Sequence, residues 1–196
     1  AIALNLFALW LRLARTGHLR LRAGVFVPLS CLLWLCHTFG WGVLGVLAFS
    51  AELIRQHDRG HRWFDAWLRS CIGCLPLALP MLMMIAWRSG EHVTGMTGDW
   101  FNWQAKFGWM AMVLRDRWQF YDVASTAVLY VILFKGFRDP NIEYSRNLGL
   151  SALFLLAVFI VLPRLVFGSA YADMRLAPFV IGLIALRPRK GLSIRG

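Results

Sequence analysis

The chain has 196 residues, of which 59% are hydrophobic and only 16% are charged. A soluble domain is nearer half apolar and a quarter charged, so this composition argues against a soluble globular protein. The net charge of +11 would suggest nucleic acid as a partner in a soluble chain. Here the basic residues instead lie at the ends of long apolar blocks, where they would meet anionic head groups. We expect an integral membrane protein whose partners are membrane lipids, and no nucleic acid.

Six apolar segments follow one another along the chain and predict an all-α, polytopic bundle of transmembrane helices. Together they make a single transmembrane domain over residues 1–196, because no internal repeat or low-complexity linker divides them. The segments are residues 1–14, 23–51, 70–87, 122–134, 148–167 and 172–186.

The first apolar segment, AIALNLFALWLRLA, begins at the first residue of the chain. It has neither a basic stretch before it nor a small-residue cleavage site, so it does not resemble a signal peptide. We expect residues 1–14 to be a truncated span and the chain to be part of a longer protein.

The second segment, residues 23–51, is ambiguous in length. Its 29 residues would form about 43 Å of helix, which is long for one crossing and short for two. The sequence leaves both possibilities open and slightly favours one tilted or kinked helix. His37 lies inside this segment, beside Gly40 and Gly42. An ionisable residue within a span is a candidate functional site. Equally, the glycines could permit a kink or close helix packing, with His37 bonded to a neighbouring helix.

Orientation follows from the basic residues in the connections. The C-terminal tail RPRKGLSIRG is strongly basic, so we expect it in the cytoplasm of a bacterial inner membrane. Counting backwards, residues 135–147 and the arm at 52–69 are then cytoplasmic, and residues 88–121 lie at the outer face.

The outer-face stretch at residues 88–121 is amphipathic. Trp103, Lys106, Phe107 and Met110 recur at the spacing of one helix face. This pattern predicts a helix lying in the membrane interface, and lipid anchoring alone would explain it. Alternatively, the helix is a lid over a lipid-linked substrate, with Lys106 and the tryptophans meeting its phosphate and sugar groups.

The last segment opens with Asp173 and Arg175, at the outer face. Asp173 can cap the free N–H groups of a helix N-terminus. Arg175 requires an anion, because a cation is unfavourable at that end of the helix dipole. Arg164 lies just across a short connection, and two guanidiniums with a helix N-terminus could clamp a phosphate. The alternative is a snorkelling Arg164 and a surface pair between Asp173 and Arg175.

Cysteine and histidine spacings offer weaker signals. Cys71 and Cys74 form a CxxC in apolar surroundings without an acidic or histidine partner, as small buried hydrophobes do. His57 and His61 form an HxxxH among arginines, which favours a solvated arm that binds head groups over a metal site. We therefore expect no metal and no cofactor.

Three features together resemble a known family. They are the many apolar spans, the aromatic outer stretch with Trp103 and Lys106, and the ADMRLAP sequence that enters the last segment. This layout resembles the C-terminal half of bacterial integral-membrane glycosyltransferases of the type C superfamily, which use polyprenyl-phosphate-linked sugars. The resemblance covers residues 20–187.

The resemblance implies a role for Arg164, Arg175 and Lys106 near the phosphate of the donor, with Asp173 orienting Arg175. In that superfamily the catalytic acid lies in the first outer loop, which we expect upstream of this chain. No catalytic residue is therefore assigned. Two alternatives remain open: a transporter or flippase subunit, and a non-catalytic membrane assembly protein.

Overall fold

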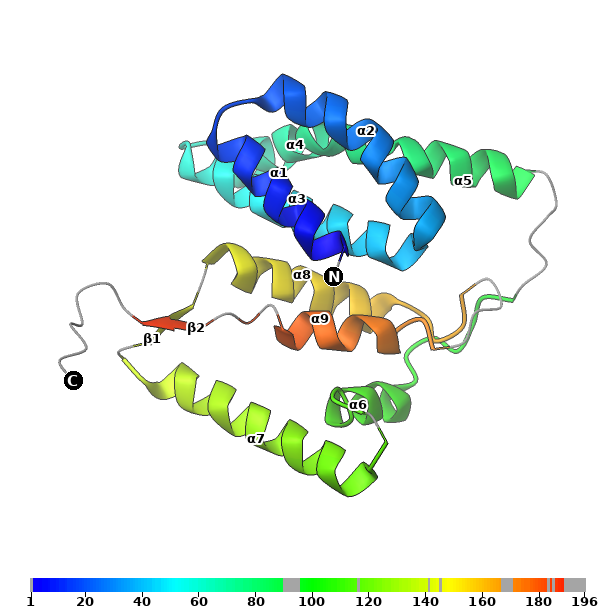
Figure 1. The fold of residues 1–196 in the computed structure, drawn as a ribbon, viewed down its shortest axis with the longest axis vertical. Helices are drawn as coiled ribbons and strands as arrows, with labels where there is room; N and C mark the ends of the chain where they lie inside the picture. Colours follow the sequence, from blue (N-terminus) through cyan, green and yellow to red (C-terminus); the bar gives the residue numbers. More distant parts are fainter. Residues whose placement is uncertain are drawn as a thin grey trace. The chain divides into compact units, whose positions relative to one another are not determined.

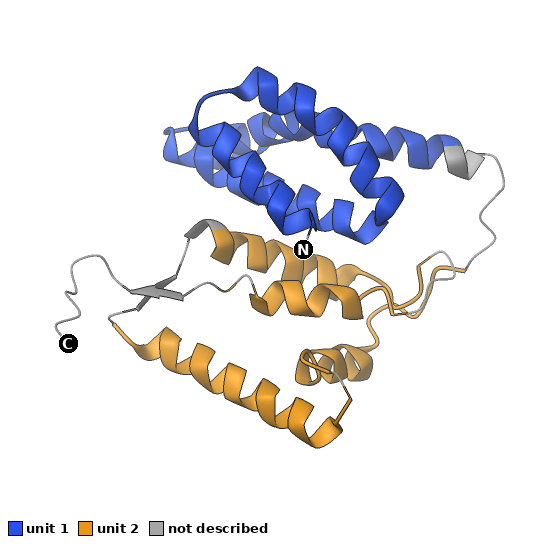
Figure 2. Cartoon of the chain, in the orientation of Figure 1, with its two compact units in different colours: residues 1–94 blue, residues 95–196 orange. Residues whose placement is uncertain are grey.

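The computed structural model describes residues 2–89, 96–115, 117–140, 142–144, 146–166, 171–182, 184 and 186–188. Almost all of the secondary structure in these residues is helical, which confirms the all-α expectation. The chain divides into two compact units, Ala1–Thr94 and Gly95–Gly196 (Figure 2).

Unit 1 is a set of packed helices whose apolar faces meet in one core (Figure 1). Trp10 and Phe26 pack edge to face at its centre, with ring centroids 4.9 Å apart. Leu44 and Leu47, on the third helix, are completely buried. The elements of unit 1 are α1 (Ile2–Arg15), α2 (Leu19–Cys36), α3 (Thr38–Asp58), α4 (Trp63–Cys74), η1 (Leu75–Leu77) and α5 (Leu79–Ser89).

The block at residues 23–51 is a helical hairpin, and the slight preference for one tilted or kinked helix was wrong. α2 and α3 are separated by His37 alone, whose backbone is extended. The ring of His37 accepts a hydrogen bond from Gly40 N–H (3.3 Å) and so caps α3. Both helices reach beyond the apolar block into charged sequence, and their lengths correspond to about 27 Å and 31 Å. Each is long enough to cross a membrane.

The third apolar segment is broken where its two prolines lie. α4 with η1 meets α5 at a bend of 64°. Pro80 has no N–H, so the carbonyl of Pro76 four residues earlier loses its helical partner. Ser30 Oγ of α2 shares its single hydrogen between the carbonyl of Val27 (2.9 Å) and that of Pro76 (3.3 Å). Trp41 Nε1 of α3 donates to the carbonyl of Leu77 (2.9 Å). Neighbouring helices thus satisfy the polar groups that the break exposes.

In unit 2, short strand pairings lie at both ends of helix α8. Before α8, β1 pairs antiparallel with β2, which brings the connection after α7 beside the C-terminal part of the chain. After α8, Gly98 and Leu165 form an isolated bridge. The elements of unit 2 are α6 (Trp103–Ala111), α7 (Gln119–Arg138), β1 (Ile142–Tyr144), α8 (Arg146–Val161), η2 (Met174–Leu176), α9 (Ala177–Gly182) and β2 (Leu186–Pro188).

The protein is a membrane protein with fewer candidate spans than the six expected. Among the described residues, α2, α3 and α7 are long and apolar enough to cross a membrane, and the bent pair α4–α5 would make a fourth. The first segment is a helix of 14 residues and α8 one of 16, both below the length of a span. The segment at 172–186 is not one helix: α9 ends after 6 residues, and the chain continues into β2.

Candidate functional site

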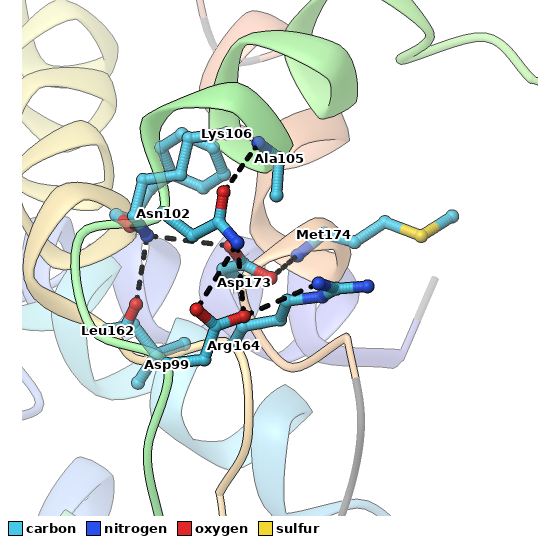
Figure 3. A network of polar contacts seen from close by, with 9 residues as sticks. Asp99, Asn102, Ala105, Lys106, Leu162, Arg164, Asp173 and Met174 are labelled. Atoms are coloured by element: carbon cyan, nitrogen blue, oxygen red, sulfur yellow. Dashed lines mark hydrogen bonds and ion pairs between the residues drawn. The ribbon is translucent and has the colours of Figure 1, made fainter.

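The predicted residues Lys106, Arg164 and Asp173 do come together, in a polar network at the end of α8 (Figure 3). The network also contains Asp99 and Asn102, which precede α6. We call these five residues the polar network. They come from three stretches of sequence: 99–106, 164 and 173.

Lys106 occupies the buried half of the polar network. Its side chain is 3% exposed, and its ammonium donates to the carbonyls of Phe159 (2.6 Å) and Leu162 (2.9 Å). The third contact is an ion pair with Asp173 Oδ2 at 3.5 Å. An ammonium has three N–H donors, so these protein oxygens use all of them. The ammonium of Lys106 is thus engaged by the protein, whereas the sequence had predicted a contact with a lipid phosphate.

The reason for this burial lies in Pro163. In a continuing helix, the carbonyl of Phe159 would accept from the N–H four residues later, but Pro163 has none. Lys106 supplies the missing donor from a helix more than fifty residues away. The positive charge of Lys106 also interacts favourably with the negative, C-terminal end of the α8 dipole. Lys106 is thus the C-terminal cap of α8.

Asp173 completes the buried half. Its side chain is 1% exposed, and Oδ1 accepts from the N–H of Met174 (2.9 Å) at the start of η2. The expected capping role is therefore confirmed, although the helix that it caps is a single 3₁₀ turn. Its described side-chain partners are Lys106 and Met174.

Asp99 and Arg164 form the accessible half of the polar network. Arg164 Nη1 lies 3.3 Å from Asp99 Oδ2, and the two side chains are 32% and 33% exposed. Asn102 holds the carboxylate through its amide nitrogen (3.2 Å) and uses its carbonyl oxygen to cap α6 at the N–H of Ala105 (3.0 Å). Among the described residues, the guanidinium of Arg164 pairs with Asp99 through one nitrogen, Nη1, and a guanidinium has five N–H donors in all.

Backbone strain is concentrated at the same place. Among the described residues, the non-glycine residues with positive φ are Asp99 (60°), Phe101 (54°) and Tyr171 (63°). Asp99 belongs to the polar network, and Tyr171 lies beneath the guanidinium of Arg164, with its ring centroid 5.0 Å away. The backbone N–H of Arg164 donates to the carbonyl of Asp99 and fixes the two loops together (3.3 Å). Left-handed non-glycine residues cost free energy and cluster at functional sites.

Exposed aromatic rings lie next to Asn102 in the chain, at the start of α6. Trp103 and Phe107 are 50% and 71% exposed on α6, and their centroids are 6.4 Å apart. Phe101 lies 6.2 Å from Trp103 on the other side. The indole nitrogen of Trp109, whose ring packs edge to face on Tyr171, is buried without a hydrogen-bond partner in the described part of the chain. Trp103 is thus placed beside the site as a flat, exposed apolar surface.

The helix expected around residues 103–110 is confirmed as α6. The prediction that Trp103, Lys106 and Phe107 share one exposed face is not. Trp103 and Phe107 point outward, whereas Lys106 points into unit 2. Arg175 lies on η2, two residues after Asp173, with an exposed side chain. His37 belongs to unit 1, where it caps α3 at the hairpin turn with an exposed side chain.

The chain matches no protein-family model, no curated protein and no solved structure. The function must therefore be argued from the geometry of these residues.

A second polar cluster, in unit 1, was missed by the sequence reasoning. Glu52 on α3 is 1% exposed and accepts from Arg22 Nη1 (3.1 Å), Gln56 Nε2 (3.0 Å) and the guanidinium of Arg55. Arg22 also lies over the ring of Trp10, 4.0 Å from its centroid. Glu52 had been assigned to a solvated arm. The available signal was the apolar sequence on both sides of it, FSAELI.

Two histidines expected in that arm have structural contacts. His57 stacks on Trp63, with centroids 3.9 Å apart, and its Nδ1 lies 3.2 Å from the carbonyl of His61. Within the described ranges, no group of three or more His, Cys, Asp or Glu residues could hold a metal.

A cavity of about 360 Å³ opens before α7. Its lining includes two arginines, Arg115 and Arg117, and the largely buried residue Asp122. The charges offset one another in part, so this cavity is a weaker anion site than the accessible half of the polar network.

Proposed function

We propose that this protein is a membrane-embedded, glycosyltransferase-like protein that handles lipid-phosphate-linked sugars at the outer membrane face. The observation that carries the proposal is the pair of Asp99 and Arg164, each about one-third exposed, in loops with left-handed residues and with the ring of Tyr171 against the guanidinium. Such a site combines a cation for a phosphate, a carboxylate for hydroxyl groups, and ring faces for the apolar faces of a sugar.

The division of the polar network into two halves supports this proposal. The buried ion pair between Lys106 and Asp173 fixes the ends of α6 and α8 relative to η2. Binding sites need a rigid support whose own polar groups are satisfied. In this proposal Lys106 and Asp173 are positioning residues, and Arg164 and Arg175 are the residues that meet the phosphate.

Arg164 is suited to a phosphate for a further reason. Its pairing with Asp99 uses one nitrogen, Nη1. A planar guanidinium can present two parallel donors to phosphate oxygens, which an ammonium cannot. Tyr171 below the guanidinium restricts its orientation, so a ligand loses less conformational entropy on binding.

In the proposed orientation the loops of the polar network lie at the outer face of the membrane and the paired strands at the cytoplasmic face. β1 lies in the basic connection after α7, and β2 pairs with it at the opposite end of α8 from Arg164. Basic connections favour the cytoplasm. The C-terminal residues would then be cytoplasmic in a bacterial inner membrane.

The experiment is a binding measurement on the purified full chain in lipid nanodiscs, with a polyprenyl-phosphate-linked hexose as the probe. Loss of a charge-assisted hydrogen bond costs about 1.5–3 kcal/mol, so Arg164→Gln should weaken binding by about 10- to 100-fold. Arg138→Gln is the matched control, because this exposed arginine also lies over an aromatic ring, that of Phe134. Equal affinities for the parent chain and Arg164→Gln would reject the proposal.

A second candidate, a transporter or flippase subunit, is favoured by one observation. Arg22 and Glu52 are buried on two helices of membrane-spanning length, and buried charges within spans often mark transport pathways. The pair lies near one end of the hairpin, however, about 5 Å from the start of α2 and 9 Å from the end of α3. Lipid or solute flux in proteoliposomes that is abolished by Glu52→Gln would favour this candidate. The third possibility, a non-catalytic assembly protein, predicts neither activity.

A further inference from the structure

The hairpin of α2 and α3 gathers two basic connections at the same end of unit 1. Arg22 Nη1 contacts Glu52 Oε2 at 3.1 Å across thirty residues, so the start of α2 lies beside the end of α3. The turn between α1 and α2 and the turn between α3 and α4 are therefore neighbours. A single continuous helix over residues 23–51 would have put these turns on opposite sides of a membrane.

The exposed cations at this end are arginines. Arg12 and Arg15 end α1, Arg20 begins α2, and Arg59 and Arg62 lie between α3 and α4. We call these five residues the arginine end. All five side chains are exposed.

The nearby acidic residues do not balance these cations. The carboxylate of Glu52 is buried and is already engaged by two other arginines, Arg22 and Arg55, so that inner cluster itself carries a net charge of +1. Asp58 and Asp65 are the remaining acids of this region. Against five exposed arginines they leave a charge of +3.

Exposed aromatic side chains lie beside the arginine end, at the start of α4. Trp63, Phe64 and Trp67 are 55%, 74% and 49% exposed. Aromatic rings of this kind lie at the level of lipid head groups. The combination of a cationic surface and an aromatic border is complementary to an anionic membrane surface.

We propose that the arginine end of unit 1 binds the phosphate groups of anionic phospholipids. One guanidinium can donate to two oxygens of the same phosphate. The buried cluster around Glu52 holds the two turns close together, so that both can bind head groups of the same lipid leaflet. This site lies outside the polar network and is independent of the function proposed above.

The test is native mass spectrometry of the full chain in detergent with phosphatidylglycerol or phosphatidylcholine of identical acyl chains. The parent should retain phosphatidylglycerol preferentially. Each basic residue near an anionic membrane contributes about 1 kcal/mol, so Arg59→Gln/Arg62→Gln should lower that preference by about tenfold or more. Lys135→Gln/Arg138→Gln, an exposed pair on one helix of unit 2, is the control and should leave it unchanged.

A competition arm separates lipid head groups from free phosphate. Inorganic phosphate added at the lipid concentration should not displace phosphatidylglycerol, because it lacks the acyl chains that keep the lipid at the protein surface. Displacement by inorganic phosphate, equal retention of the two lipids, or an equal loss in the control variant would each overturn the proposal. Unchanged thermal unfolding of both double variants establishes that the comparison concerns folded protein.

Discussion

Replacement of Lys106 by methionine tests whether the buried half of the polar network holds unit 2 together. Methionine has nearly the length of lysine but no donor and no charge. Lys106→Met would leave Asp173, which is 1% exposed, without its cation and the carbonyl of Phe159 without a donor, because Pro163 cannot supply one. Breaking a buried ion pair from one side costs about 3–5 kcal/mol. We expect the free energy of unfolding to fall by about 4 kcal/mol.

The double variant Lys106→Met/Asp173→Asn separates the two contributions. It removes the uncompensated carboxylate and keeps an acceptor for the N–H of Met174. What remains is the cost of two carbonyls without donors, those of Phe159 and Leu162, at about 1 kcal/mol each. The double variant should therefore be about 2 kcal/mol more stable than Lys106→Met alone.

The assay is unfolding of the purified chain in mixed micelles by titration with SDS, followed by far-UV ellipticity. Hydrogen–deuterium exchange should locate the change, with faster exchange in residues 159–166 and 172–177. Arg138→Met, which removes an exposed cation, should change stability by less than about 0.5 kcal/mol. A Lys106→Met variant within about 1 kcal/mol of the parent, or a double variant less stable than the single one, would refute the reasoning. Lys106 would then be free to meet a ligand.

Two further substitutions test unit 1 by thermal unfolding in micelles. A Cβ on Gly73 would lie 3.3 Å from Cγ of Glu52, a side chain that its donors hold in place, so Gly73→Ala should destabilise by about 1 kcal/mol. Gly149→Ala, where the added Cβ meets nothing within 4 Å, should instead stabilise by up to about 1 kcal/mol. A stabilising Gly73→Ala would mean that Glu52 can move. Ser30→Ala removes the hydroxyl that the carbonyls of Val27 and Pro76 share and should cost about 1 kcal/mol; no loss would show that another group takes the carbonyl of Pro76.

The sequence predicted those features whose physical cause lies in neighbouring residues. Asp173 caps the turn that follows it, and a short connection brings it beside Arg164. The apolar blocks identified a helical membrane protein. These predictions rest on neighbouring residues, whose interactions a linear pattern records.

The failures arise where a distant residue supplies the missing partner. The face of α6 was predicted from helical spacing, but Lys106 turns inward because the carbonyl that Pro163 leaves unbonded lies on another helix. The apolar block at 23–51 was predicted shorter than the hairpin of α2 and α3, which begins before it and ends after it, because Arg22 and Glu52 neutralise each other only in the folded hairpin. Asp99 was overlooked because its partner Arg164 comes 65 residues later.

The single-residue link at His37 has a consequence for biogenesis. Arg22 leaves the ribosome thirty residues before Glu52, so α2 has no counter-ion while it emerges. A lone arginine opposes insertion by about 2.5–3.5 kcal/mol at the centre of a span and by less near its end. We expect α2 to wait at the membrane surface until α3 has been synthesised, and the two helices to enter together as one pre-paired unit. In this sense the insertion of α2 depends on Glu52, a residue of the helix that follows it.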